Sequence, residues 1–175
     1  MLQMRGGNII KYFWEKHSFM LIILPVCFII DRIAKSLAVL HLKNKSSIII
    51  INNFLNLSYV ENKGAAFGLL STLDHKLRMP ILSLIAFIAL FFIIYLYMHL
   101  KTDERLMKIS FSFILGGAAG NIWDRVMQGY VVDFIDVHYY RYFTWPAFNF
   151  ADIVITAGAG LIIFGALTAQ KGENS

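Results

Sequence analysis

The sequence predicts an all-α membrane protein with four transmembrane helices, a small extracytoplasmic β-sheet and an interfacial helix. Of its 175 residues, 58% are hydrophobic and 15% are charged, whereas soluble domains contain about 25% charged residues. Four apolar stretches are long enough to cross a bilayer. Because the chain length suits one domain, we expect a single integral-membrane domain over residues 1–175.

The predicted spans cover about residues 19–40, 79–100, 106–123 and 148–167. The second is the most regular, because it contains no charge and, at about 1.5 Å per residue, crosses the roughly 30 Å hydrocarbon core. The third and fourth are rich in Gly and Ala, which let helices approach each other closely. We therefore expect these two spans to pack inside a bundle.

The first span also has some features of a cleaved signal peptide. Lys11 and Lys16 precede its apolar core, and residues 24–27 resemble a lipoprotein cleavage box. The box lacks the small residues that cleavage needs, however, and the apolar run continues past Cys27. The missing small residues and the continued apolar run favour a membrane span over a cleaved signal peptide.

Residues 41–78 form a long connection that we expect on the outer side of the membrane. Residues 47–51 and 54–60 are β-prone runs separated by two asparagines, which predicts a small hairpin on the membrane surface. A turn is expected at residues 61–64. A short interfacial helix is expected over residues 65–70.

The distribution of basic residues predicts that both termini are cytoplasmic. The segments expected on the same side of the membrane as the two termini hold seven Lys and Arg residues in 33 positions, whereas the outer connections hold seven in 62. Cytoplasmic loops are enriched in these residues. Because the basic residues flank apolar segments, the net charge of +5 predicts no nucleic-acid partner. An outer aromatic belt is expected from Tyr139, Tyr140, Tyr142, Phe143 and Trp145.

Two aspartates stand in apolar surroundings on the expected outer side. Asp152 lies about one turn inside the fourth span, and Asp133 is flanked by Val132 and Phe134. A charge at such positions is costly, so each is a candidate functional residue. Two carboxylates in a low-dielectric cleft share one proton, so that one activates water while the other hydrogen-bonds to a carbonyl. Such a pair meets the requirement for peptide hydrolysis without a metal or a covalent intermediate.

Further polar residues lie near the same membrane boundary. Asn121, Asp124 and Arg125 share one helix face, and we expect Asp124 to pair with Arg125. Asp31 and Lys35 are four positions apart and predict a second helix-end ion pair. The sequence contains no zinc-binding helix motif, no catalytic-serine turn and no phosphate-binding loop.

Two other interpretations of the aspartate pair stay open. The pair could be a buried structural pair, or a proton relay in a small transporter. Transporters usually show internal repeats or paired broken helices, and the sequence shows neither. A purely structural membrane role explains the spans but not the placement of the polar residues on one side.

Five short blocks follow one another through most of the chain. They read Asp-Arg-Ile-Ala-Lys at residues 31–35, Glu-Asn-Lys-Gly-Ala-Ala-Phe at 61–67, Gly-Ala-Ala-Gly-Asn-Ile-Trp-Asp-Arg at 117–125, Val-Asp-Phe at 132–134 and Phe-Asn-Phe-Ala-Asp at 148–152. In these blocks the sequence resembles the lipoprotein signal peptidases, bacterial type II signal peptidases that are integral-membrane aspartyl proteases. Each block alone is weakly specific, whereas five in order are strongly specific.

The resemblance implies an activity and a location. The family cuts the signal peptide from prolipoproteins just before a cysteine that carries diacylglycerol. It does so in the bacterial cytoplasmic membrane, with the active site at the outer face. Prolipoproteins and membrane lipid are the implied partners, no cofactor is implied, and we expect a monomer.

The resemblance also implies roles for residues. The catalytic aspartates fall on Asp133 and Asp152. Supporting residues fall on Asp31, Lys35, Asn62, Gly64, Asn121, Asp124, Arg125 and Asn149. Arg32 stands where the family often has a smaller or uncharged polar residue, and we expect this departure not to touch the chemistry.

Overall fold

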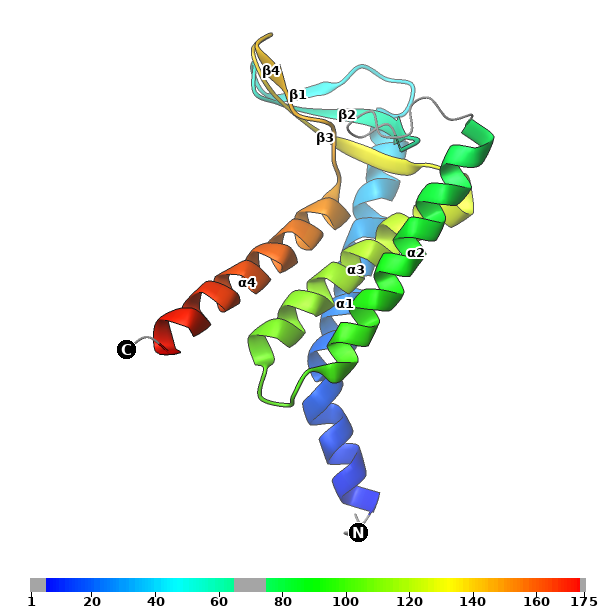
Figure 1. Cartoon of the computed structure of the whole chain (residues 1–175). Helices are drawn as coiled ribbons and strands as arrows, with labels where there is room; N and C mark the ends of the chain where they lie inside the picture. Colours follow the sequence, from blue (N-terminus) through cyan, green and yellow to red (C-terminus); the bar gives the residue numbers. More distant parts are fainter. Residues whose placement is uncertain (1–5, 65–74, 174–175) are drawn as a thin grey trace.

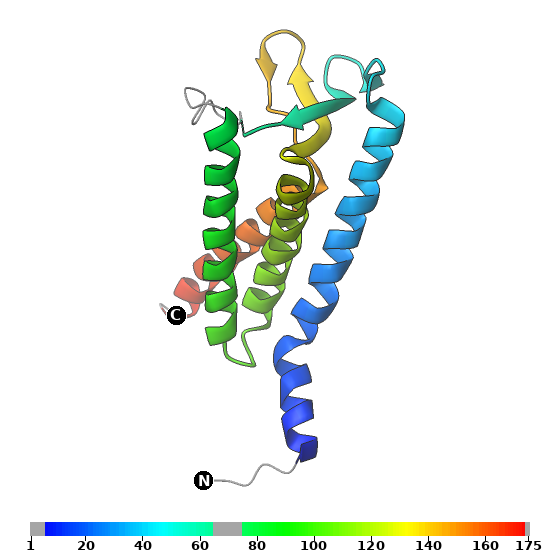
Figure 2. The same ribbon diagram turned by 90° about the vertical axis from the view of Figure 1, so that its right-hand side faces the viewer.

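The computed structural model describes residues 6–64 and 75–173. Its elements are α1 (Gly6–Leu42), β1 (Ile48–Ile51), β2 (Leu55–Asn62), α2 (His75–His99), α3 (Arg105–Gln128), β3 (Val131–Tyr139), β4 (Phe143–Thr144) and α4 (Phe150–Glu173). The strands form one sheet at one end of the helices, called the sheet end below (Figure 1). The turned view shows α2, α3 and α1 side by side beneath the strands (Figure 2).

Within the described residues, two helices contain stretches that are long and apolar enough to cross a membrane: Pro80–His99 in α2 and Phe150–Thr168 in α4. On α2 the side chains of Ile88, Phe91 and Phe92 are exposed. Exposed apolar surface of this kind fits contact with lipid rather than water. That α1 and α3 also cross the membrane, and that both termini are cytoplasmic, stay predictions.

The first helix differs from the prediction at its beginning. It starts at Gly6 rather than near residue 19, so the segment ahead of the predicted span is also helical. Contacts with the end of α2 hold this extension. The Lys16 ammonium donates to the Met98 carbonyl at 3.0 Å, and the Tyr97 hydroxyl donates to the Lys16 carbonyl at 3.3 Å. Hydropathy locates only the apolar part of a helix, so it does not detect this extension.

α3 lies at the centre of the bundle and packs against α1, α2 and α4. Gly117 faces α4, where an added Cβ atom would lie 2.5 Å from the Ala151 carbonyl oxygen. Gly120 faces α1, where an added Cβ atom would collide with the Asp31 carboxylate. These close approaches confirm the predicted packing role of the small residues and bring the polar ends of three helices together.

The sheet is antiparallel throughout, with the strand order β1-β2-β3-β4. The predicted hairpin is confirmed as β1 and β2, whereas β3 and β4 are elements that the sequence analysis missed. β3 contains Asp133 and Asp136 among its apolar residues, which hides a β-strand pattern. Its partner β2 is distant in the sequence, so no local turn signal joins the two strands.

The end of β2 corrects a second expectation. Residues 61–64 were expected to form a turn, but Glu61 and Asn62 continue the strand and pair with β3. The chain turns after them, at Gly64, whose φ of 81° lies in the left-handed region that glycine favours. Cross-strand hydrogen bonds with β3 therefore extend β2 by two residues beyond the predicted hairpin.

The segment before α4 ties the sheet to the last helix. The Phe148 carbonyl accepts a hydrogen bond from the Ile135 amide at 2.9 Å, and its amide donates to the Ile135 carbonyl at 3.0 Å. α4 consequently begins at Phe150, two residues after the predicted start of the span. This pairing places β3 beside the first turn of α4.

An apolar cluster fastens the sheet to the end of α1. Ala38 and Leu42 pack there against Val132 of β3. The side chains of the predicted aromatic belt are exposed at the sheet end, with Tyr142 at 86%. The interfacial helix expected over residues 65–70 lies outside the described residues.

Candidate active site

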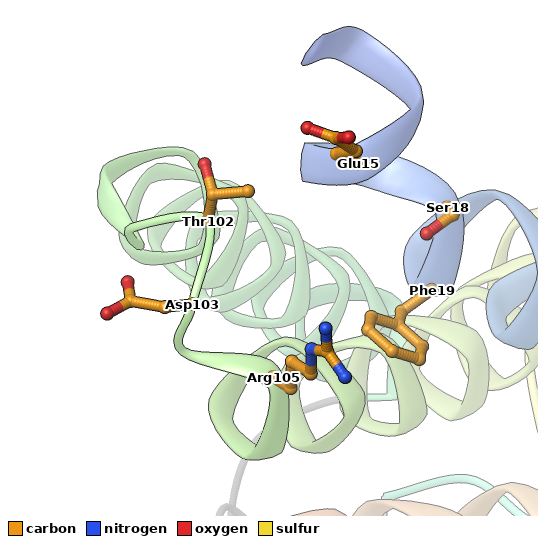
Figure 3. A pocket seen from close by; sticks show the side chains of 6 residues that line it. All are labelled: Glu15, Ser18, Phe19, Thr102, Asp103 and Arg105. Carbon is orange, nitrogen blue, oxygen red and sulfur yellow. The ribbon is translucent and has the colours of Figure 1, made fainter. Parts of the chain in front are cut away.

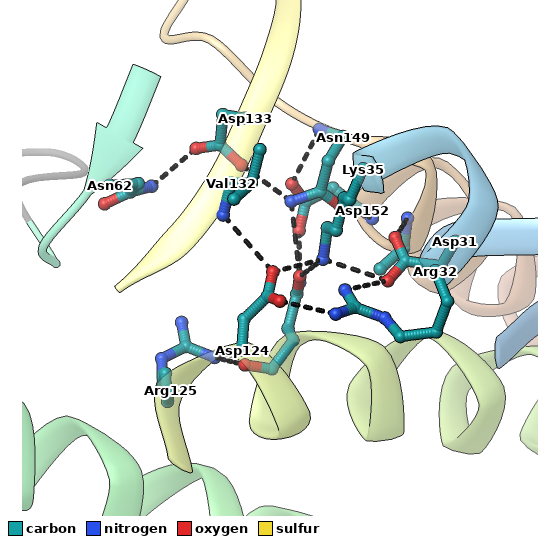
Figure 4. Close-up of polar contacts among 12 residues, drawn as sticks. Asp31, Arg32, Lys35, Asn62, Asp124, Arg125, Val132, Asp133, Asn149 and Asp152 are labelled. Atoms are coloured by element: carbon teal, nitrogen blue, oxygen red, sulfur yellow. Dashed lines mark hydrogen bonds and ion pairs between the residues drawn. The ribbon is translucent and has the colours of Figure 1, made fainter. Parts of the chain in front are cut away.

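The two ends of the bundle differ in how their polar groups are arranged. A hollow of about 490 Å³ lies at the end opposite the sheet. It is lined by Glu15, Ser18, Phe19, Thr102, Asp103 and Arg105 (Figure 3). Among the described residues, Glu15 pairs with Lys11 at 3.9 Å along α1 rather than with a group across the hollow. At the sheet end, in contrast, polar side chains form one connected network (Figure 4).

Asp152 is positioned by the start of α4. Asn149 precedes the helix, and its side-chain oxygen accepts a hydrogen bond from the Asp152 amide at 3.1 Å. The Asp152 carboxylate in turn accepts one from the Asn149 amide at 3.1 Å, which completes a reciprocal capping box. The second carboxylate oxygen accepts a hydrogen bond from the Asn121 side chain at 2.8 Å. Asp152 is thus held by both α4 and α3.

Asp133 lies on β3 and is 1% exposed. One carboxylate oxygen accepts a hydrogen bond from the Asn62 side chain at 2.8 Å, and the other accepts one from the Asn149 side chain at 2.6 Å. Asn149 therefore contacts both Asp133 and Asp152. The two aspartates selected from the sequence meet around this one residue.

Asn62 reaches Asp133 because of the register of the sheet. It pairs with Val131, so its side chain lies on the same face as that of Asp133. Its side-chain oxygen accepts a hydrogen bond from the Gly64 amide at 2.9 Å. That bond leaves the amide NH2 group of Asn62 pointing toward the carboxylate.

Lys35 of α1 is buried and holds three side chains at once. Its ammonium lies 3.0 Å from an Asp31 oxygen and 2.9 Å from an Asp124 oxygen. It also donates to the Asn121 side-chain oxygen at 2.8 Å. An ammonium has three donors and no acceptor, so these contacts use all of its protons and turn the Asn121 NH2 group toward Asp152. The predicted Asp31–Lys35 ion pair is confirmed.

Asp31 and Asp124 also hold the backbone next to the two candidate catalytic residues. Asp31 accepts a hydrogen bond from the amide of Ala151, one residue before Asp152, at 3.1 Å. Asp124 accepts one from the amide of Val132, one residue before Asp133, at 3.2 Å. Each buried carboxylate therefore positions one of the two segments that meet at Asn149.

The expected pairing of Asp124 with Arg125 is wrong. Arg125 donates to the Asn121 backbone carbonyl at 3.2 Å, whereas Asp124 pairs with Arg32 at 2.7 Å and with Lys35. Adjacent residues on a helix point in different directions, so Asp124 faces α1 and Arg125 does not. Sequence spacing showed which residues share a helix but not which helix they face.

Arg32 is the member of the network that the sequence analysis missed. Its guanidinium also lies 2.9 Å from Asp31, so it bridges two buried carboxylates. Arg32 therefore belongs to the network, but its contacts are with supporting residues and do not test the expectation that it leaves the chemistry untouched. Its position next to Asp31 was the available signal, but the contact with Asp124 depends on the packing of α1 against α3.

Two mainly apolar hollows open beside Asp152. One, of about 480 Å³, is lined by Asp152 together with Trp145, Phe148, Ile153, Thr156 and Ala157. The other, of about 330 Å³, lies between α2, α3 and α4, with Asn121, Arg125 and Asp152 among the residues that line it. An apolar ligand in either hollow would bring an attached polar bond close to the Asp152 carboxylate.

The two aspartates have different surroundings. Burial raises the pKa of Asp133 to about 6, and the charge of Asp152 acts in the same direction, while hydrogen bonds from Asn62 and Asn149 oppose the rise. Asp152 instead borders the hollows. Such a pair can hold one proton between two carboxylates and take a second from water. The described residues contain no group of three or more side chains suited to a metal ion, and metal-free activity stays a prediction.

Comparison with known proteins relates this chain to a protein family. A family model described as signal peptidase (SPase) II matches residues 23–168. The chain is 40% identical over 144 residues to the lipoprotein signal peptidase of Syntrophotalea carbinolica, which covers 82% of this chain and 88% of the relative. It is 42% identical over 141 residues to that of Francisella tularensis subsp. novicida, covering 81% and 86%. A solved structure described as a bacterial membrane enzyme at 2.3 Å resolution matches with a TM-score of 0.75 and 32% identity, over 89% of this chain and 91% of that chain.

Proposed function

Because the chain belongs to the signal peptidase II family, we propose that it removes the signal peptide from diacylglyceryl-modified prolipoproteins, cutting just before the lipidated cysteine. The family is one of bacterial membrane proteases. The observation that best supports the proposal is the contact of Asn149 with both Asp133 and Asp152. This arrangement gives two carboxylates a common position at which a water and a carbonyl can meet.

The proposed reaction uses the aspartate pair as acid and base. The ionised carboxylate takes a proton from water, and the oxygen of that water attacks the scissile carbonyl carbon. The protonated carboxyl donates a hydrogen bond to the carbonyl oxygen, on which charge develops. The carbon–nitrogen bond then breaks, and the nitrogen of the lipidated cysteine takes up the proton that the carboxylate removed from water. The products are a signal peptide carboxylate and a free cysteine amine.

The proposed topology places this reaction at the outer membrane face. Four helices cross the bilayer, both termini are cytoplasmic, and the sheet end is outside. The density of basic residues and the exposed aromatic side chains at the sheet end support this orientation. We also propose a monomer as the working unit, since one chain supplies every residue of the network in Figure 4.

Cleavage of a purified lipidated prolipoprotein tests the proposal. Asp133→Asn and Asp152→Asn should each lower the rate by about a hundredfold or more, because an amide cannot act as a general base. Asp136→Asn is the matched control, since Asp136 lies on the same strand as Asp133 and faces His138 at 3.7 Å. This control should retain activity, and a chelator should leave the wild-type rate unchanged.

The transporter interpretation predicts a different result. A proton relay would leave the purified wild-type protein unable to cut the precursor in detergent. Full processing by either folded Asn variant would refute the catalytic assignment. Loss of the wild-type rate in chelator, restored by one divalent metal, would refute the metal-free mechanism.

A further inference from the structure

The guanidinium of Arg32 joins two helices through two buried carboxylates. One of its nitrogens lies 2.9 Å from Asp31 on α1, and another lies 2.7 Å from Asp124 on α3. We propose that Arg32 is a positioning residue: it supplies the positive charge that allows Lys35 to hold Asn121 against Asp152. This inference rests on the proposed function, because it concerns the same aspartate pair.

The first step of the argument is the balance of charge. Asp31, Arg32, Lys35 and Asp124 form what we call the buried ion cluster, which has two acids and two bases. The Asp31, Lys35 and Asp124 side chains are at most 2% exposed, and that of Arg32 is 24% exposed. Buried charges are tolerated when they are paired. Loss of the Arg32 charge would leave the cluster with a net charge of minus one.

The second step concerns the donors of Lys35. Its ammonium already contacts Asp31, Asp124 and the side-chain oxygen of Asn121. Without Arg32, both carboxylates depend on this ammonium for neutralisation within the described residues. The stronger electrostatic attraction of Lys35 to these two carboxylates would then compete with its hydrogen bond to Asn121. Because that contact orients the Asn121 amide, Asp152 would lose a fixed hydrogen-bond donor.

The third step is the effect of the cluster on the aspartate pair. The pair itself is Asp133 on β3 and Asp152 on α4. Among the described residues, the charged groups near it come from two further elements: Asp31, Arg32 and Lys35 from α1, and Asp124 and Arg125 from α3. A net negative charge in the cluster disfavours a further negative charge on the pair. Replacement of Arg32 by a neutral residue should therefore make the pair harder to ionise.

A purely structural role is the competing explanation. Arg32 lies 6.0 Å from the centre of the Phe28 ring, and Phe28 packs edge-on against Trp123. Removal of the arginine would therefore loosen α1 from α3 even if its charge had no effect on the site. A structural role predicts lower thermal stability, but it predicts no shift in the titration of the aspartate pair.

The experiment compares Arg32→Gln, Arg32→Lys and the wild type as full-length proteins in detergent micelles. Asp133 is titrated by carbon-13 NMR of labelled aspartate, with Asp133→Asn to assign its signal, and cleavage of lipidated precursor is measured against pH. Arg32→Gln should move the midpoint of the Asp133 titration to higher pH by about half a pH unit or more. The midpoint of the acid limb in the pH profile of kcat should move by the same amount in the same direction. Arg32→Lys should restore most of the shift, because it keeps the charge.

Lys45→Gln is the matched control. It also removes one positive charge near the sheet end, but Lys45 is exposed and contacts the Leu40 carbonyl at 3.5 Å rather than the buried ion cluster. This variant should leave both midpoints unchanged. A shift as large as that of Arg32→Gln would show that any lost charge has the same effect, and would overturn the proposal.

A double variant keeps the proposal testable if Arg32→Gln does not fold. Arg32→Gln with Asp124→Asn removes one charge of each sign, so charge balance predicts that folding and the Asp133 midpoint return toward the wild type. The proposal fails if neither this variant nor Arg32→Lys recovers them, or if a folded Arg32→Gln protein titrates like the wild type. The NMR measurement does not depend on cleavage, so a wild-type protein that cuts no precursor would refute the proposed function alone.

Discussion

Asn149 and Asp152 hold each other at the start of α4 through two reciprocal hydrogen bonds, each 3.1 Å long. The side-chain NH2 group of Asn149 meanwhile donates to Asp133 at 2.6 Å and to Asn121 at 3.2 Å. The side-chain oxygen of Asn149 therefore caps α4, and its side-chain nitrogen contacts the other residues of the candidate site. These two functions of one side chain can be separated by substitution.

Asn149→Ser and Asn149→Ala should differ in stability but not in activity. Serine is a good N-cap, so Asn149→Ser keeps the helix start, whereas Asn149→Ala should cost about 1 kcal/mol from loss of the cap alone. Neither side chain reaches Asp133 with an NH2 group, so both variants should lose most of their cleavage rate. Thermal unfolding in detergent and a cleavage assay measure the two effects. Full activity of Asn149→Ser would contradict the role of the amide.

Asp124→Asn should lower stability and activity together. Asp124 neutralises both Arg32 and Lys35, and removal of one partner of a buried ion pair typically costs about 3–5 kcal/mol. Its carboxylate also accepts the Val132 amide, and an Asn oxygen would make this hydrogen bond more weakly, so the segment that carries Asp133 should be held less firmly. Chemical unfolding and cleavage rates of the purified variant measure both losses.

Arg125→Gln provides the comparison for Asp124→Asn. Arg125 donates to a backbone carbonyl, so its loss should cost less stability than the loss of Asp124. The two variants are matched, because each removes one charge at the same end of α3. An Asp124→Asn protein with wild-type stability and no activity would place Asp124 in the catalytic pair instead.

The pKa of Asp133 predicts how stability depends on pH. Burial raises this pKa from 3.8 to about 6, so the folded protein binds the proton more tightly than the unfolded chain. The resulting stability is complete below pH 3.8 and is lost as the pH rises through 6. Between pH 5 and pH 8, the wild type should therefore lose about 1 kcal/mol relative to Asp133→Asn. Unfolding curves of both proteins at the two pH values measure the difference, and a constant difference would contradict a raised pKa.

The helices were predictable because hydropathy and helix periodicity are local. The predicted spans match parts of α1, α2, α3 and α4, whereas β3 was missed because its partner β2 is far away in the sequence. The Asp31–Lys35 pair was predictable for the same local reason, since both residues lie on one helix face. Interactions within an element can be read from its sequence.

The rest of the network depends on how elements pack. Asp124 meets Arg32 and Lys35 because glycines let α3 approach α1 closely, and no spacing along one helix specifies that contact. Asn149 similarly reaches Asp133 because β3 pairs with the segment before α4. The resemblance to a family pointed to most of these residues, but it did not say which of them touch.

The position of Asp152 constrains how a substrate reaches the site. This residue lies in the first turn of α4, at the start of the apolar stretch Phe150–Thr168. Two mainly apolar hollows border its carboxylate. On the proposed topology and site, a scissile bond would therefore come down to the membrane interface rather than approach from bulk water. Acyl chains attached beside that bond would hold it at this depth.

Lipidation of the precursor should consequently control its cleavage. Each buried methylene contributes about 0.8 kcal/mol, so a diacylglyceryl group both concentrates the peptide at the membrane and fixes the depth of the bond at Asp133 and Asp152. The unlipidated precursor, with the same peptide sequence, should be cut very poorly even at high concentration.

Rates for both precursors should be compared in detergent and in bilayers, with Asp152→Asn as the inactive control. If the lipid only concentrates the substrate, it should raise the cleavage rate in bilayers, and this advantage should disappear at saturating substrate. If it also sets the depth of the bond, it should raise kcat in both detergent and bilayers. Equal rates for the two precursors in both settings would mean that the site recognises the peptide alone.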